Sequence, residues 1–68
     1  MTEIERLRTA TGVAIFITQL CLDDLRKLVN DGNYEDCKEF ALVAKQNAET
    51  VCNLVFELME ANKEEDDE

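Results

Sequence analysis

Hydrophobic residues recur along the chain with the period of an α-helix, in two segments that a short polar turn separates. The segments are residues 3–29 and 34–61, and the turn is 30–33. Gly32 suits the positive φ that follows a helix, and Asn33 is a favoured residue just before a helix starts. The pattern therefore predicts an all-α protein, a two-helix antiparallel hairpin.

The first helix has a clear start signal and one weak stretch. Thr2 followed by Glu5 fits a capping box. Residues 9–12 are poor helix formers, since glycine costs about 1 kcal/mol relative to alanine inside a helix, and this leaves a break or kink there open. Residues 13–18 are rich in β-branched side chains and taken alone would suit a strand. The helical spacing from 14 to 29 favours one helix.

The second helix carries small and apolar residues at heptad spacing, which is typical of a seam between helices. These residues are Tyr34, Cys37, Ala41, Ala44, Ala48, Val51, Val55 and Leu58, and Phe40, Cys52, Leu54 and Met59 widen the stripe. The three alanines favour a close approach of two helix axes in an antiparallel bundle. Asn47 lies near the edge of this stripe, either solvated or fixing the register of a seam.

The two helices carry more hydrophobic residues than one hairpin can cover. The apolar face of the first helix consists of Ile4, Leu7, Ala14, Ile15, Cys21, Leu22, Leu25, Leu28 and Val29. Val13, Phe16 and Leu20 fall outside that face, and Leu42 and Phe56 fall off the main stripe of the second helix. Hairpins of this size bury too little to fold alone. We therefore expect a homo-oligomer, most simply a four-helix bundle of two hairpins.

The five outlying residues are the candidate partner-binding residues of the chain. Burying one phenylalanine side chain stabilises a folded or bound state by roughly 1.5–3 kcal/mol, so we expect an exposed Phe16 to be covered by a partner surface. One interpretation is a binding face for another macromolecule, which the protein would capture as an adaptor, inhibitor or regulator. The other is a second contact surface within a homo-oligomer.

The net charge of −9 is unevenly distributed. Residues 1–30 carry four acids and four bases, 31–62 carry seven acids and two lysines, and 63–68 carry five acids and one lysine. An acidic second half repels phosphate, which disfavours a nucleic-acid partner and favours a basic protein. Residues 63–68 contain no apolar side chain, so we expect a disordered acidic tail after a helical hairpin of residues 1–62.

Patterns of catalytic or metal-binding residues are missing from the sequence. The chain has no histidine, no Cys-x-x-Cys pair and no glycine-rich phosphate loop, so we expect neither an enzyme nor a bound metal or cofactor. The three cysteines, Cys21, Cys37 and Cys52, lie on the predicted inward stripes, and we expect them to be free thiols. Free thiols persist in a reducing compartment, so we expect a cytoplasmic protein. The longest apolar run, 13–17, is far shorter than the roughly 20 residues of a membrane-spanning helix.

A second hypothesis is a small-ligand protein that holds a nucleotide-like molecule at the oligomer interface. Its phosphate would contact cationic side chains, and Phe16 or Tyr34 would stack on the base. The cations are Arg6, Arg8, Arg26 and Lys27. The alternative for these cations is pairing within their own helix, such as Glu3 with Arg6 or Asp23 with Lys27.

The short hairpin with an alanine seam and an acidic tail is similar in layout to the Rop family of plasmid copy-number regulators. Members of that family form a dimeric four-helix bundle that binds paired RNA loops. With Phe16 placed on the family's RNA-contacting phenylalanine, Lys27 matches its lysine. Glu5, Gly12 and Leu20 stand where the family has lysine, asparagine and glutamine. The resemblance implies RNA binding as a lesser alternative, and these three departures count against it.

Overall fold

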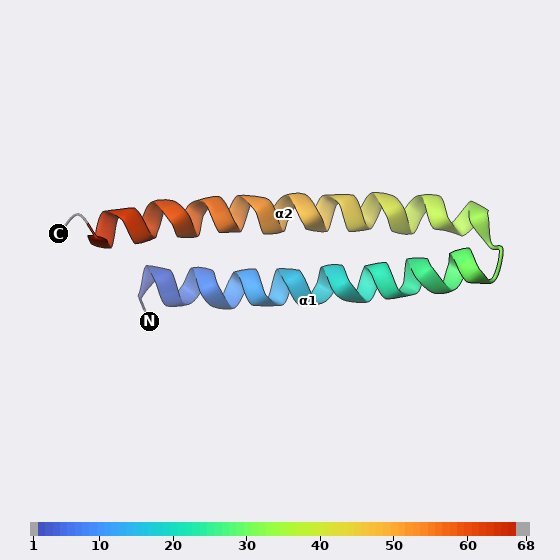
Figure 1. The fold of residues 1–68 in the computed structure, drawn as a ribbon, viewed down its shortest axis with the longest axis horizontal. Coiled ribbons are helices and arrows are strands. Elements are labelled where there is room, and N and C mark those ends of the chain that lie inside the picture. Colours follow the sequence, from blue (N-terminus) through green and yellow to red (C-terminus); the bar gives the residue numbers. More distant parts are fainter. Residues whose placement is uncertain (1, 67–68) are drawn as a thin grey trace.

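The computed structural model describes residues 2–66 of the chain, with side chains for residues 2–64. Its two helices are α1 (Glu3–Asn30) and α2 (Tyr34–Asp66). They lie side by side and antiparallel, with the turn at one end and both chain termini at the other (Figure 1). The all-α hairpin predicted from the sequence is confirmed.

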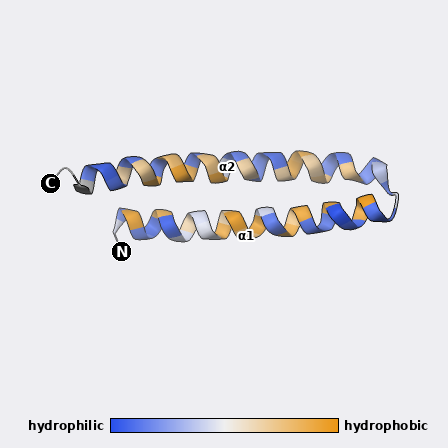
Figure 2. Ribbon diagram, in the orientation of Figure 1, coloured by the Kyte–Doolittle hydropathy of each residue, from blue (hydrophilic) through white to orange (hydrophobic). Residues whose placement is uncertain are grey.

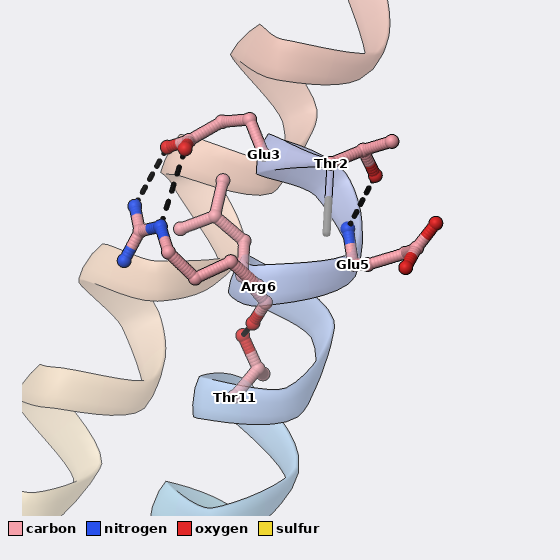
Figure 3. A network of polar contacts seen from close by, with 6 residues as sticks. Thr2, Glu3, Glu5, Arg6 and Thr11 are labelled. Atoms are coloured by element: carbon pink, nitrogen blue, oxygen red, sulfur yellow. Dashed lines mark hydrogen bonds and ion pairs between the residues drawn. The ribbon is translucent and has the colours of Figure 1, made fainter.

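α1 begins at the predicted cap and continues without a break. The Thr2 hydroxyl oxygen accepts a hydrogen bond from the Glu5 backbone N–H at 3.1 Å (Figure 3). Residues 9–12 are helical, so the poor helix formers there do not break α1. Within this stretch the Thr11 hydroxyl donates to the Leu7 carbonyl at 2.6 Å, so its polar group is satisfied inside the helix.

The turn closes α1 with a Schellman motif. Gly32 has φ 76°, its N–H donates to the Val29 carbonyl at 3.1 Å, and the Asn33 N–H donates to the Leu28 carbonyl at 2.9 Å. The Asn33 side-chain amide also donates to the Asp36 carboxylate in the first turn of α2 at 2.8 Å. Local residue chemistry therefore fixes where the chain reverses.

The helices contact each other along one heptad seam, in alternating steps of three and four residues. On α1 the buried and half-buried seam residues are Ile4, Leu7, Thr11, Ala14, Thr18, Cys21, Leu25 and Leu28. On α2 they are Cys37, Phe40, Ala44, Asn47, Val51, Leu54, Leu58 and Ala61. All other residues in the described part of the helices are exposed, except the half-buried Ala10.

The α2 seam differs from the predicted one. Tyr34, Ala41, Ala48 and Val55 were expected to face the neighbouring helix, but all four are exposed. Phe40 and Leu54 take part in the seam instead. A helix that is apolar over a wide stripe contains two overlapping heptads, and the larger side chains of Phe40 and Leu54 bury more area against α1.

The structure decides between the two alternatives for Asn47 and corrects the prediction for Cys52. Asn47 is a seam residue and not a solvated edge position, and its amide donates to the Cys21 sulfur at 3.4 Å. Cys21 and Cys37 are half-buried as expected, whereas Cys52, predicted to face inward, is exposed. The thiol of Cys52 therefore lies on the outer surface of the hairpin.

α2 extends further than the sequence indicated. The helix runs to Asp66, so residues 63–66 of the predicted disordered tail are helical, and residues 67 and 68 lie outside the described residues. Lys63 and glutamate are good helix formers, and the Lys63 ammonium lies 3.9 Å from a Glu60 carboxylate oxygen one turn earlier.

The core of the hairpin is very small. In the described part of the chain, Leu7 (2% exposed) and Ala44 (7%) are its buried hydrophobic residues. The radius of gyration is 15.7 Å, against about 11 Å for a compact domain of this length. The hairpin is a rod of 54 × 16 × 13 Å whose seam side chains meet water at both edges. Neither helix, as far as it is described, is long and apolar enough to cross a membrane.

Leu7 is the side chain whose truncation should cost the most stability. We expect Leu7→Ala to lower the free energy of unfolding by about 2–5 kcal/mol, since it empties the most buried site. Leu42→Ala makes the same chemical change at a residue that is 52% exposed, and should cost about 0.5 kcal/mol or less. Urea unfolding of both variants at one fixed protein concentration measures this difference. Equal losses would contradict the seam described above.

Candidate functional site

One long side of the hairpin is apolar on both helices. Ile15, Thr18 and Gln19 of α1 line a hollow of about 280 Å³ together with Ala48, Val51 and Cys52 of α2. Residues at seven-residue steps, which is close to two helical turns, continue the same side in both directions. We call this side the groove face. Its exposed apolar residues are Ile15, Leu22, Val29, Ala41, Ala48, Cys52, Val55 and Met59.

The charges that border the groove face are mainly positive. Lys45 lies beside Ala48 and Cys52 together with one acid, Glu49, and Lys38 precedes Lys45 by seven residues. Arg26 follows Gln19 by seven residues on α1. These three bases all lie in the half of the face nearest the turn. The half nearest the termini carries Arg8 and one acid, Glu5.

The opposite side of the hairpin carries most of the acids of α2. Glu57, Glu60 and Glu64 line a second hollow with Glu3, Arg6, Leu7, Phe56 and Ala61. Asp36 and Glu39 lie on the same stripes of α2, three heptads before Glu57 and Glu60. We call this side the acidic face. The net charge of −9 is therefore not spread evenly around the molecule.

The candidate partner-binding residues separate into two groups in the structure. Val13, Phe16 and Leu20 form one exposed cluster on α1, which we call the Phe16 ridge, and Phe16 is 59% exposed. Phe16 lies two residues from the seam residues Ala14 and Thr18 on either side, so it points away from α2. Val13 and Leu20 share the heptad position of Arg6 and so lie toward the acidic face.

The other two candidates, Leu42 and Phe56, lie on α2. Leu42 is two residues from Phe40 and Ala44, so it points away from α1, and Phe56 lines the hollow on the acidic face. They are therefore on the far helix from the Phe16 ridge. A single hairpin brings Val13, Phe16 and Leu20 together and leaves Leu42 and Phe56 apart from them.

The four candidate ligand-binding cations do not converge in one hairpin. Arg6 and Arg26 are twenty residues apart in α1, which is about 30 Å along the axis. Arg8 lies near Arg6 and Lys27 beside Arg26, while Tyr34 is exposed at the turn. Figure 2 shows the hydrophobic middle of α1, with hydrophilic and hydrophobic residues alternating toward both of its ends. A pocket using all four cations would need more than one chain.

Arg6 is already paired within its helix, as the sequence suggested. Its guanidinium donates to both oxygens of Glu3, with Nη2 at 2.6 Å from Oε1 and Nε at 3.2 Å from Oε2 (Figure 3). Arg26 lies 3.7 Å from Asp23, which was predicted to pair with Lys27. The pKa of Arg6 is raised by its hydrogen bond to Glu3, and the charge of Glu57 across the hairpin adds to this shift.

Neither the side chains of the described residues nor comparison with known proteins indicates a particular chemistry. Within the described residues, no group of three or more Cys, Asp and Glu side chains is placed to hold a metal ion. No protein-family model, curated protein or solved structure matches the chain. The exposed surfaces of the hairpin are therefore the features that bear on its function.

The Glu3–Arg6 pair gives a test of the charge placement. The pKa of Glu3 is lowered by the Arg6 hydrogen bond and by the attraction of its charge. A lowered pKa means that this pair stabilises α1 above the ordinary pKa of glutamate, and that the stabilisation is lost as the pH falls through the Glu3 pKa. We expect Arg6→Gln to return the Glu3 pKa toward its ordinary value in an NMR titration. Arg26→Gln, the control, should leave it unchanged, and an unchanged Glu3 pKa in Arg6→Gln would refute the pairing.

Proposed function

We propose that the chain is a non-enzymatic cytoplasmic binding protein that associates with itself and captures another macromolecule, most simply a basic protein segment, on the Phe16 ridge. Such a protein would act as an adaptor, inhibitor or regulator. The observation that carries the proposal is the imbalance of apolar side chains. Leu7 and Ala44 are buried, whereas large hydrophobic residues are exposed along both helices.

The surplus is too large to be the ordinary apolar content of a protein surface. Scattered exposed hydrophobic residues are normal, but contiguous ones mark contact sites. Val13, Phe16 and Leu20 are neighbours at i, i+3 and i+7 on one side of α1, each about half exposed or more. Side chains with this spacing present one continuous apolar strip to a docking helix or strand.

The electrostatics of the hairpin favour a basic partner on this ridge. The Phe16 ridge lies on the same side as the acidic face, whose acids Asp36, Glu39, Glu57 and Glu60 on α2 lie toward the two ends of the ridge, while uncharged residues of α2 lie level with it. A segment with apolar residues toward the ridge and lysine or arginine toward the acids at its two ends would satisfy both surfaces. Complementary charge of this kind raises association rates and selects against acidic competitors.

Phe16→Glu tests the capture surface. We expect this variant to lose its bound partner, because a buried carboxylate opposite an apolar contact is costly, while its helicity and oligomer mass remain those of the wild type. The control is Thr9→Glu, which places the same charge at the equivalent heptad position two turns earlier. Native mass spectrometry of each protein, purified gently from its own cells under reducing conditions, measures oligomer mass and bound mass together.

Three results of this experiment have distinct meanings. Added mass on the wild type and on Thr9→Glu, but not on Phe16→Glu, supports capture at the ridge. Added mass that persists on Phe16→Glu refutes it. Loss of the oligomer in Phe16→Glu would also refute it and would assign the ridge to contact between copies.

A further inference from the structure

We infer that the groove face binds a second copy of the chain, groove face to groove face and antiparallel, so that two hairpins form a closed four-helix dimer. The inference rests on the self-association part of the proposed function. It adds the surface that makes the contact and the orientation of the two copies. Partner capture on the Phe16 ridge is independent of it.

The groove face continues the seam on both helices. Ile15, Leu22 and Val29 each follow a seam residue of α1, and Ala41, Ala48 and Val55 each follow a seam residue of α2. Seam residues plus one apolar flank make the wide stripe typical of helices that pack against two neighbours in a bundle. On the acidic face the corresponding flank of α2 carries Val43 among Asp36, Thr50, Glu57 and Glu64, and that of α1 carries Ile17 between acids, so the groove face is the more apolar of the two.

The hairpin exposes more surface than a compact folded protein of its mass. The difference is about the area that one contact with a second copy would bury. The chain exposes 5396 Å² at a mass of 7.8 kDa, whereas a folded monomer of that mass exposes about 4,400 Å². The excess is roughly 1,000 Å². A standard protein interface buries about 800 Å² on each partner. One second copy on one face is therefore enough to give the chain the surface of an ordinary folded protein.

Charge selects the orientation. Arg26, Lys38 and Lys45 border the half of the groove face nearest the turn. Two copies arranged in parallel would place all six of these bases at one end of the interface. In the antiparallel arrangement the three bases of each copy face the other copy's terminal half, where the charges of Arg8 and Glu5 cancel. The electrostatic repulsion between the bases is weaker when they are far apart, so the antiparallel arrangement is favoured.

Small residues make the close packing feasible. A two-fold axis across the middle of the groove face places α2 of one copy along α2 of the other, and Ala41 and Ala48 then lie in the contact. Alanine at these flank positions allows the two helix axes to approach closely. Contact between two identical groove faces closes on itself at two copies, as isologous interfaces do.

Two matched valine substitutions test which face makes the contact. Val55, 40% exposed, lies on the groove face, and Val43, 44% exposed, lies on the opposite flank of the seam in the same helix. In sedimentation equilibrium we expect the wild type and Val43→Glu at twice 7.8 kDa, and Val55→Glu at 7.8 kDa at the same loading concentration. Circular dichroism of each variant reports whether the helices persist.

Cross-linking tests the orientation and does not depend on a disruptive variant. In a background with the three native cysteines replaced by serine, Lys38→Cys marks the turn half of the groove face and Met59→Cys marks the terminal half. The two proteins are mixed, re-equilibrated and treated with a short bis-maleimide. Antiparallel docking predicts mixed dimers that join position 38 to position 59. Parallel docking predicts self-linked dimers of each variant, and that result would overturn the proposed orientation.

The outcomes separate this inference from the proposed function. A monomeric wild type at high concentration would refute self-association as such, and the groove-face dimer with it. A wild-type dimer that Val43→Glu dissociates and Val55→Glu does not would overturn only the groove face. Assembly of the wild type beyond two copies would overturn the closed dimer and indicate contact between unlike faces.

Discussion

A single seam between two helices is the constraint on which the rest of this molecule depends. Two helices touch along one line, so most seam side chains are covered by the neighbouring helix but still reach water at the edges of the contact. In this hairpin several seam positions are also small or polar, among them Thr11, Ala14, Thr18 and Asn47. The seam therefore fixes the register of the helices while burying little apolar area. The exposed flanks follow from this geometry, and they are the reason for expecting association.

The features that the sequence predicted correctly are those decided by near neighbours. Thr2 and Glu5 are three residues apart, and the hydrogen bonds that close the Gly32 turn go to the carbonyls of residues 27–29 in the last turn of α1. Such signals act within one helical turn, so no knowledge of tertiary packing is needed to interpret them. The continuity of α1 through residues 9–12 is a different case, because the low propensity of that stretch was overruled by contacts of Leu7 and Thr11 with α2.

The features that sequence analysis missed depend on which helix faces which. α2 contains two heptads that share Cys37, Ala44, Val51 and Leu58, and one of them adds Ala41, Ala48 and Val55. Periodicity cannot rank the two, since both repeat every seven residues. The choice is made by the fit of α2 against α1, which also places Asn47 beside Cys21 and turns Cys52 outward. The heptad that includes Ala41, Ala48 and Val55 is the one that the sequence predicts for the seam, but in the structure these residues form part of the groove face.

The separation of the two outer surfaces matters for how the protein would work. The Phe16 ridge points away from α2 and lies on the same side as the acidic face, whereas the groove face lies on the other side of the seam. A dimer formed on the groove face leaves both of its ridges open, and because α1 of one copy then lies along α1 of the other, both ridges are on the α1 side of the four-helix rod. Each dimer would then offer two equivalent binding sites, and a partner with two sites of its own would gain affinity from the linkage without any new contact. Self-association would thus cover the apolar groove face and also double the number of binding sites for the partner. The two surfaces are separate, so a substitution can disrupt one without the other.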